Sequence, residues 1–231
     1  MAPGIYFLRG KQLLMIRGVI FDMDGLLVDT EIVSLEVYQT MLDNAQKPIL
    51  SSDDYAASYS GHNSIDNMKK IIEDYQLPYT LEEGLAISEQ IETKLLQRGV
   101  ALKTGAKELL QFLNDNDYTI NLATSSTEQR AHDILLQNNI LQYFDQLTFN
   151  AEVSHGKPAP DIYLKALKKS SLRPEEAIVF EDSEAGIQSG TAANIKVICI
   201  PDMHIPSQKY LDLAIQTYDT LDESIQYFTK I

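Results

Sequence analysis

The sequence has little of three things: cysteine, positive charge and long apolar runs. Its one cysteine, Cys199, excludes an intrachain disulfide, and its place in the apolar run 196–200 predicts a small buried side chain. A chain without disulfides is typical of a reducing compartment. Lys and Arg number 19 against 33 Asp and Glu, which gives a net charge of −14. This balance argues against nucleic acid or an anionic membrane as a partner, because both require a basic face.

Signals for export and for membrane insertion are missing as well. No stretch approaches the ~18 apolar residues that a membrane helix needs. Residues 1–14 lack the basic start, the sustained apolar core and the small-residue cleavage site of a signal peptide. We therefore expect a cytoplasmic protein with an N-terminal extension, and a first compact strand that begins at Met15.

The hydrophobic pattern predicts an α/β protein with a helical insert. A chain of 231 residues with 44% hydrophobic content suits a core domain with a small insert. Residues 19–21 are typical of a strand buried on both faces of a parallel sheet, and from residue 100 onward strands and helices alternate. The expected units are a Rossmann-like core over 15–31 and 100–231, an all-helical domain over 32–99, and the extension 1–14.

Helix starts are also readable from capping patterns. Thr80 and Glu83 form a capping box at the start of a helix in the insert. Asp29 or Thr30 is expected to cap the helix that follows the first strand. Ser126 with Gln129 is expected to form another capping box, at the start of a helix in the core.

After the first strand, the pattern predicts further strands at 118–123, 147–150, 177–180 and 196–200.

Two carboxylates, Asp22 and Asp24, follow the first buried strand directly. In open α/β sheets, ligands bind beyond the carboxyl ends of the strands. Because side chains alternate along an extended chain, we expect Asp22 and Asp24 to point the same way and to share one cation, while Gly25 lets the backbone turn. Oxygen-only ligands favour Mg²⁺. A hairpin turn at Asp24-Gly25 is the simpler alternative, and the spacing does not fit a calcium loop.

Further polar residues follow the later strands, at the point where each strand ends and a loop begins. Because the carboxyl ends of parallel strands meet at one edge, these groups together form a set that suits phosphoryl transfer. Taken singly they have ordinary explanations as helix caps, a solvated loop lysine and acids at a helix N-terminus. The groups are Thr124 and Ser125 after the second strand, Lys157 after the third, and Glu181 and Asp182 after the fourth.

Each of these residues has a chemical role in such a site. Asp22 is the expected nucleophile, and Asp24 is placed to protonate the leaving oxygen and then to deprotonate water. Thr124 and the backbone N–H of Ser125 are expected to hold phosphate oxygens, and Lys157 to supply a fixed positive charge. The expected Mg²⁺ ligands are the Asp22 carboxylate, the Asp24 carbonyl and Asp182, with Glu181 as a further ligand or as the partner of a metal-bound water.

At this point the chain resembles the haloacid dehalogenase superfamily, in the branch of phosphatases and β-phosphoglucomutase-like enzymes with a helical cap. The resemblance implies a Rossmann-like core with a mobile cap, and the same roles for Asp22, Asp24, Thr124, Lys157 and Asp182. Members that remove halide lack the Asp24 equivalent, so its presence implies phosphate chemistry. The resemblance covers roughly 16–231 and rests on Phe21-Asp-Met-Asp-Gly-Leu-Leu-Val-Asp-Thr-Glu31, Ala123-Thr-Ser-Ser126, Gly156-Lys-Pro-Ala-Pro-Asp-Ile-Tyr163 and Phe180-Glu-Asp-Ser-Glu-Ala-Gly-Ile187.

Three functions stay open at this stage. The leading hypothesis is a Mg²⁺-dependent phosphatase, a monomer by default, that acts on a small phosphorylated metabolite such as a sugar phosphate or a nucleotide. The second is a sugar phosphomutase, although this chain has Ser34 and Ser60-Gly-His-Asn-Ser64 where mutases of the branch carry basic residues. The third is a non-catalytic protein that binds a phosphorylated ligand. Gly61 and His62 are candidate contacts for the leaving group, with an exposed loop histidine as an equal alternative.

Overall fold

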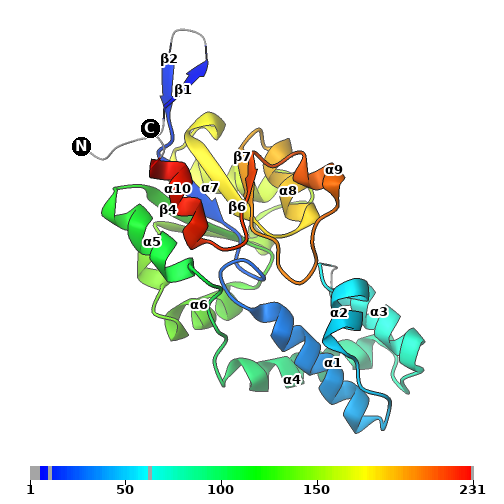
Figure 1. The fold of residues 1–231 in the computed structure, drawn as a ribbon. Helices are drawn as coiled ribbons and strands as arrows, with labels where there is room; N and C mark the ends of the chain where they lie inside the picture. The colour runs from blue at the N-terminus through cyan, green and yellow to red at the C-terminus, as the bar shows by residue number, and fades with distance from the viewer. Residues whose placement is uncertain (1–5, 10–11, 62–63, 230–231) are drawn as a thin grey trace. The chain divides into compact units, whose positions relative to one another are not determined.

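The structure is a computed structural model, and it describes residues 6–9, 12–61 and 64–229. The chain divides into two compact units, Met1–Val28 with Ala101–Ile231, and Asp29–Val100 (Figure 1). The larger unit contains a parallel sheet, and the smaller unit is helical over its described residues. No helix in the described ranges combines the length and the apolar character that crossing a membrane requires.

Six parallel strands form the centre of the larger unit, in the order β5-β4-β3-β6-β7-β8. Every neighbouring pair runs parallel. This arrangement confirms the predicted fold class, an α/β protein with a Rossmann-like core. The strands are β3 (Gly18–Phe21), β4 (Thr119–Thr124), β5 (Gln146–Phe149), β6 (Ala177–Glu181), β7 (Lys196–Cys199) and β8 (Gln216–Thr217).

Helices connect these strands and cover the sheet. They are α5 (Ala106–Asp115), α6 (Glu128–Gln137), α7 (Asp161–Ser170), α8 (Glu184–Ala192), α9 (Gln208–Leu211) and α10 (Ile225–Thr229). Short 3₁₀ helices lie at Leu141–Tyr143, Asn150–Glu152, Pro174–Glu176 and Asp222–Ser224. The bounds of β4, β5, β6 and β7 differ from the expected ones by at most one residue at either end, a normal scatter for strand ends.

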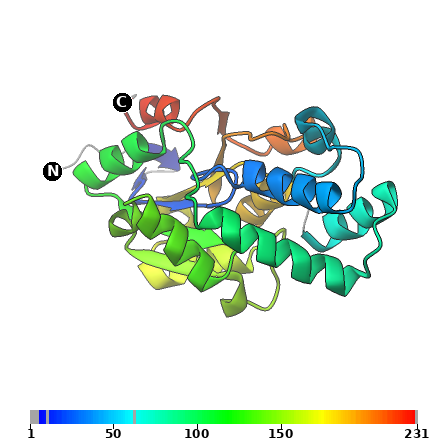
Figure 2. The same cartoon turned by 90° about the horizontal axis from the view of Figure 1, so that it is seen from below.

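The two central strands, β3 and β6, are buried along their whole length because helices cover both faces. On one face, residues of α7 and α8 pack with Ile20 and Val179 in a single apolar cluster. On the other face, Phe228 of α10 stacks on Phe180 of β6, with 6.4 Å between ring centroids. Helix α10 lies beside α5 there, where Phe112 approaches Phe228 at 6.2 Å (Figures 1 and 2).

The order of the strands reverses between β3 and β6. From β3 the chain continues to β4 and β5 on one side, and from β6 it continues to β7 and β8 on the other. In open parallel sheets such a switch point is where ligands bind, beyond the carboxyl ends of the strands. Phe21 pairs with Phe180 in register, so the residues that follow these two strands emerge next to each other.

The smaller unit consists of helices α1 (Thr30–Asn44), α2 (Ser52–Ser58), α3 (Ser64–Tyr75) and α4 (Leu81–Leu96). Thr80 and Glu83 form the predicted capping box at the start of α4. Asp29 occupies the position before α1, but its side chain makes no capping hydrogen bond. The rings of Tyr55 and Tyr59 stack in the core of this unit, with 6.2 Å between their centroids.

Two sequence-based expectations about local structure are wrong. Ser126 does not cap α6; Thr127 does, by accepting a hydrogen bond from the Arg130 backbone N–H, because the helix begins one residue later than expected. Met15 does not begin the buried strand either. It ends β2 (Gln12–Met15), which pairs antiparallel with β1 (Tyr6–Arg9) in a hairpin, and the buried strand begins at Gly18.

Candidate active site

Asp22 lies at the carboxyl end of β3, at the switch point of the sheet. Its backbone N–H donates to the carbonyl of Phe180 on β6 at 3.1 Å, which extends the strand pairing by one residue. Its side chain is buried, and Oδ1 accepts a hydrogen bond from Nζ of Lys157. The buried Asp22 carboxylate at the end of β3 is therefore paired with the ammonium group of Lys157.

Lys157 bridges two carboxylates. Besides Asp22, its Nζ contacts Oε1 of Glu181 at 2.5 Å, and only 8% of the side chain is exposed. Burial alone would lower the pKa of Lys157, but the charges of Asp22 and Glu181 raise it well above its usual value. Lys157 is thus a permanent positive charge between the ends of β3 and β6.

Glu181 is fully buried, and its carboxylate is hydrogen-bonded on both oxygens. Oε1 also accepts from the Tyr163 hydroxyl of α7 at 2.5 Å, and Oε2 accepts from the hydroxyl of Ser183 at 3.1 Å. Burial acts to raise the pKa of Glu181, but Lys157 and these hydrogen bonds lower it overall. Gly186 makes room for this carboxylate, because a Cβ there would lie 1.8 Å from the carboxyl carbon of Glu181. Glu181 therefore holds Lys157 and the following loop in place.

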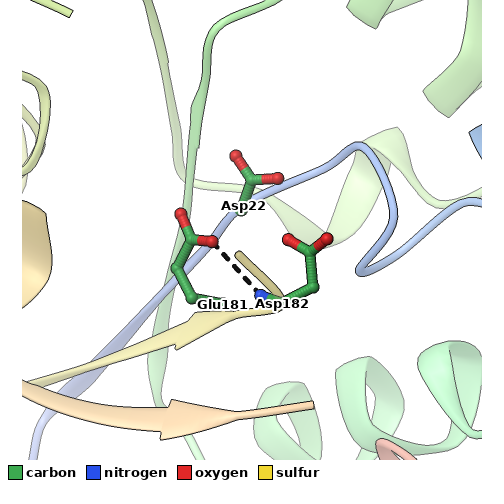
Figure 3. Close-up of side chains that lie close together, drawn as sticks. All are labelled: Asp22, Glu181 and Asp182. Carbon is green, nitrogen blue, oxygen red and sulfur yellow. Dashed lines mark hydrogen bonds between the residues drawn. The ribbon is translucent and has the colours of Figure 1, made fainter. Parts of the chain in front are cut away.

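Asp22, Glu181 and Asp182 each offer an oxygen to a shared point, with the ligand atoms all within 4.8 Å of one another (Figure 3). Figure 3 shows the three carboxylates side by side after the ends of two strands, with a hydrogen bond from the Asp182 N–H to Glu181, which measures 3.2 Å. When all three carboxylates are ionised, they exceed the single ammonium of Lys157 by two negative charges. That excess and the all-oxygen donor set fit a divalent cation such as Mg²⁺.

The protonation equilibria reflect the same crowding of negative charge. Burial raises the pKa of Asp22 to about 7, against the lowering effect of Lys157 and with the help of Glu181 and Asp24. Burial, Glu181 and Asp22 likewise raise the pKa of Asp182 well above its usual value. Both shifts mean that a cation at this place would release protons when it binds.

The side chain of Asp24 contacts groups other than these three carboxylates, and its sharing of a cation with Asp22 stays a prediction. Its Oδ1 contacts Nη1 of Arg130 at 2.6 Å, and its Oδ2 accepts from the hydroxyl of Ser126 at 2.6 Å. Gly25, the next residue, has a φ of +78°, so the chain turns directly after Asp24. The backbone carbonyl of Asp24 stays an expected ligand of the cation.

Thr124 and Ser125 lie at the end of β4, next to this carboxylate. Thr124 is buried, its hydroxyl accepts from the Ser126 backbone N–H at 3.0 Å, and it lies 3.5 Å from Oδ2 of Asp24. Ser125 is exposed at the strand end, just before α6. The ends of β3, β4 and β6 and the loop before α7 thus bring together Asp22, Asp24, Thr124, Lys157, Glu181 and Asp182.

The remaining candidates lie elsewhere or outside the described part. Gly61 is an exposed turn residue of the smaller unit with a φ of +77°. His62 lies outside the described residues. His155 is exposed and contacts Asp161 at 3.2 Å. Cys199 is buried, and burial raises the pKa of its thiol to about 12, which excludes it as a ready nucleophile.

Sequence reasoning missed four side chains that the structure brings to the site. Tyr163 is the last residue of the motif at 156–163, and Arg130 comes four residues after Ser126, about one helical turn away. The sequence therefore offered a reason to include both residues in the site. Asp202 comes just after β7 and also occupies a strand end, but no other group of the expected site pointed to it. Lys103, which forms a salt bridge with Asp202, had no sequence signal at all.

Comparison with known proteins identifies the family. The family model described as haloacid dehalogenase-like hydrolase matches residues 19–200, which include every strand-end residue described above except Asp202. The chain belongs to this family. It is therefore a hydrolase, and the resemblance read from its motifs is confirmed.

Two curated relatives are phosphatases, and a solved structure shares the fold of this hydrolase. A phosphorylated carbohydrates phosphatase from Thermotoga maritima is 30% identical over 79% of this chain and 83% of its own length. A (DL)-glycerol-3-phosphatase from Arabidopsis thaliana is 30% identical over 89% of this chain and 88% of its own. The crystal structure of a beta-phosphoglucomutase from Clostridium difficile shares the fold, with a TM-score of 0.71 and 23% identity over 92% of this chain and 96% of its own.

The raised pKa of Asp22 predicts how the stability of this hydrolase depends on pH. Between about pH 4 and pH 7 the folded metal-free chain keeps a proton on Asp22 that the unfolded chain has lost, so stability falls as pH rises through this window. Mg²⁺ binds the ionised carboxylates and should reverse the fall. We expect the melting temperature in EDTA to drop from about pH 5 to pH 8, and Mg²⁺ to raise it at pH 8 by about 5 °C.

Differential scanning fluorimetry across this range, with EDTA or Mg²⁺, measures the effect. The lowered pKa of Glu181 has the opposite sign but acts below its ordinary value of 4.5, outside the window. Asp182→Asn is the control, since it removes a proposed ligand and should abolish the Mg²⁺ shift. A Mg²⁺ shift of equal size at both ends of the range would contradict the prediction.

Proposed function

We propose that this hydrolase is a Mg²⁺-dependent phosphatase that cleaves a small phosphomonoester through an aspartyl-phosphate on Asp22. The observation that carries the proposal is the contact of the buried Asp22 carboxylate with Lys157, beside an acidic cluster at the switch point. An anionic nucleophile attacks an anionic phosphate only where positive charge offsets their repulsion. The relatives named above as phosphatases support the reaction class.

In this proposal Asp22 attacks phosphorus and Lys157 neutralises charge on the transferring group. The contacts of Lys157 with Asp22 and Glu181 fix its ammonium group at the nucleophile before substrate arrives. Such preorganised charge lowers the barrier because no reorganisation is needed during the reaction. Glu181 and Tyr163 act as positioning residues, since their hydrogen bonds hold Lys157 from behind.

We assign Asp24 the proton transfers. It would protonate the leaving oxygen in the first half of the reaction and take a proton from water in the second. Ser126 and Arg130 hold its carboxylate beside Thr124 at the end of β4, and the second task requires an ionised carboxylate. Thr124 and the Ser125 N–H would hold phosphate oxygens at the end of β4.

Mg²⁺ would be held by the Asp22 carboxylate, the Asp24 carbonyl and Asp182. When bound, it would screen the negative charge of the nucleophile and the phosphate. The structure favours an outer role for Glu181, since Lys157, Tyr163 and Ser183 already engage its oxygens. We therefore propose that Glu181 contacts the cation indirectly or not at all.

Substrate recognition is assigned to the unit Asp29–Val100, which we propose acts as a cap domain. Gly61 and His62 of this unit remain the proposed contacts for the leaving group. The names of the two relatives, a phosphorylated carbohydrates phosphatase and a (DL)-glycerol-3-phosphatase, suggest a small polar phosphate ester as the substrate. The cytoplasmic location and the monomeric state stay predictions.

The test is phosphate release from a panel of substrates with Mg²⁺ and with EDTA. The panel contains p-nitrophenyl phosphate, hexose and pentose phosphates, glycerol 3-phosphate and nucleoside 5′-monophosphates. We expect Mg²⁺-dependent turnover of at least one member, and a loss of about 10²-fold or more when EDTA removes the metal, since several kcal/mol of charge stabilisation are lost. Turnover that EDTA leaves unchanged would contradict the metal assignment.

A sugar phosphomutase is the second candidate, favoured by the shared fold with a beta-phosphoglucomutase. A mutase must hold a bisphosphate, which needs a second cationic site. Where mutases of the branch carry basic residues this chain has Ser34 and Ser60, and Ser60 is buried. Conversion of a sugar 1-phosphate into its 6-phosphate without net phosphate release would establish the mutase and overturn the phosphatase.

A further inference from the structure

A fourth carboxylate, Asp202, lies beside the acidic cluster. It follows β7, and only 5% of its side chain is exposed. Its position relative to Asp182 can be read at Gly25: a Cβ built there would lie 2.5 Å from Oδ2 of Asp182 and 3.1 Å from Oδ2 of Asp202. The two oxygens are thus separated by no more than the sum of these distances, a span that one water molecule bridges.

Asp202 is oriented by Lys103, whose Nζ contacts its other oxygen, Oδ1. Lys103 is itself fixed in the larger unit, because its backbone N–H donates to the carbonyl of Leu27 at 2.9 Å. Leu102 before it pairs with Val28 in an isolated bridge. The ammonium group therefore reaches Asp202 from a segment tied to the chain just beyond Gly25. One oxygen of Asp202 pairs with a cation, and the other is turned toward Asp182.

This arrangement is unfavourable for a purely structural salt bridge. When both are ionised, the buried side chain of Asp202 and the partly buried carboxylate of Asp182 lose free energy through repulsion and desolvation. A dication beside Asp182 removes the conflict, because the water molecules that Mg²⁺ keeps donate hydrogen bonds to nearby carboxylates.

We propose that Asp202, held by Lys103, is an outer carboxylate of the metal site, which orients Asp182 and the hydration shell of the cation. The inference rests on the proposed function, since it assumes the cation on Asp22 and Asp182. Asp202 touches no substrate in this view, so it is a positioning residue for the metal. Groups that orient metal ligands in this way change metal affinity by about 10- to 100-fold when they are replaced.

Isothermal titration calorimetry with Mg²⁺ on the full chain tests the proposal. Asp202→Asn is expected to weaken Mg²⁺ binding by about 10-fold or more. Asp219→Asn is the matched control, an exposed aspartate of the same C-terminal region, and should bind Mg²⁺ as the unmodified protein does. Unchanged Mg²⁺ affinity in Asp202→Asn, with a lower melting temperature of the metal-free protein, would show a structural salt bridge and overturn the proposal.

A double variant keeps the test decisive if Asp202→Asn lowers both affinity and stability. If the salt bridge between Lys103 and Asp202 serves only to stabilise the fold, Lys103→Met alone already removes that stabilisation. The double variant, with Asp202→Asn added, should then bind Mg²⁺ as tightly as the Lys103→Met single variant. If Asp202 acts on the cation, the double variant binds several-fold more weakly. Asp182→Asn distinguishes a failure of the Asp202 proposal from a failure of the proposed metal site. Mg²⁺ binding that does not depend on Asp182 overturns the metal site of the proposed function itself.

Discussion

Replacing Asp22 with Asn is expected to lower phosphate release by about 10³-fold or more, because removal of a catalytic nucleophile eliminates the covalent route. The amide keeps the size of the side chain and its place at the end of β3, but it cannot attack phosphorus. It also removes one proposed metal ligand. The rate should be measured with Mg²⁺ on the best substrate of the panel.

The Asp22→Asn protein should nevertheless fold. In the unmodified protein, the buried Asp22 carboxyl group has a pKa raised to about 7, so its ionised form is disfavoured when no metal is bound. A neutral amide is therefore tolerated at this position. Lys157 keeps Glu181 as its partner. We expect the melting temperature in EDTA at neutral pH to be no lower than that of the unmodified protein, which separates a chemical defect from a folding defect.

Two further measurements make the Asp22 test specific. Asp117→Asn, at an exposed aspartate before β4, is the control and should keep full activity. Rapid acid quenching with labelled substrate should trap an acyl phosphate in the unmodified protein and none in Asp22→Asn. Phosphate release by Asp22→Asn at more than about a tenth of the normal rate would exclude Asp22 as the nucleophile.

The second large effect is expected at Lys157. Lys157→Met keeps the length and the apolar stem of the side chain but leaves Asp22 and Glu181 buried without their shared cation. Breaking a buried ion pair by removing one partner destabilises a protein by about 3–5 kcal/mol. We expect a loss of this size in urea unfolding at neutral pH, together with a fall in phosphate release of about 10²-fold or more.

The pH dependence of the Lys157→Met defect is a diagnostic feature. Without the ammonium group the two carboxylates can avoid repulsion only by taking up protons, so the stability loss should shrink as pH falls. The exposed Lys168→Met on α7 is the control, with an expected change within about 0.5 kcal/mol. A loss as small as that of Lys168→Met would mean that Lys157 does not neutralise the site.

The clearest success of the sequence is the strand-end argument. Uninterrupted apolar runs predict strands that are buried on both faces, and parallel strands bring their carboxyl ends to one edge. These two statements were sufficient to expect Asp22, Lys157 and Asp182 in one place before any coordinates. The structure adds the reason that they meet so closely, since β3 and β6 are neighbours at the switch point.

The direction of side chains was less predictable. Alternation along a strand is a local rule, and it did not predict the partners of Asp24, because Arg130 and Ser126 come from α6 and the loop before it. The capping box at Thr80 is local in the same sense and was correct, since all of its partners lie within four residues. Local rules hold where no distant group competes for the same side chain.

The sequence by itself determined the alternation of strands and helices, the family and the residues at the strand ends, because these depend on short-range pattern and on the geometry of parallel sheets. Only the tertiary structure decided that Asp24 faces Arg130, that Tyr163 supports Glu181, and that Lys103 turns Asp202 toward Asp182. The contact of Lys103 with Asp202 joins residues that are 99 positions apart. Such contacts are set by how the loops pack above the sheet, and no local pattern in the chain encodes that packing.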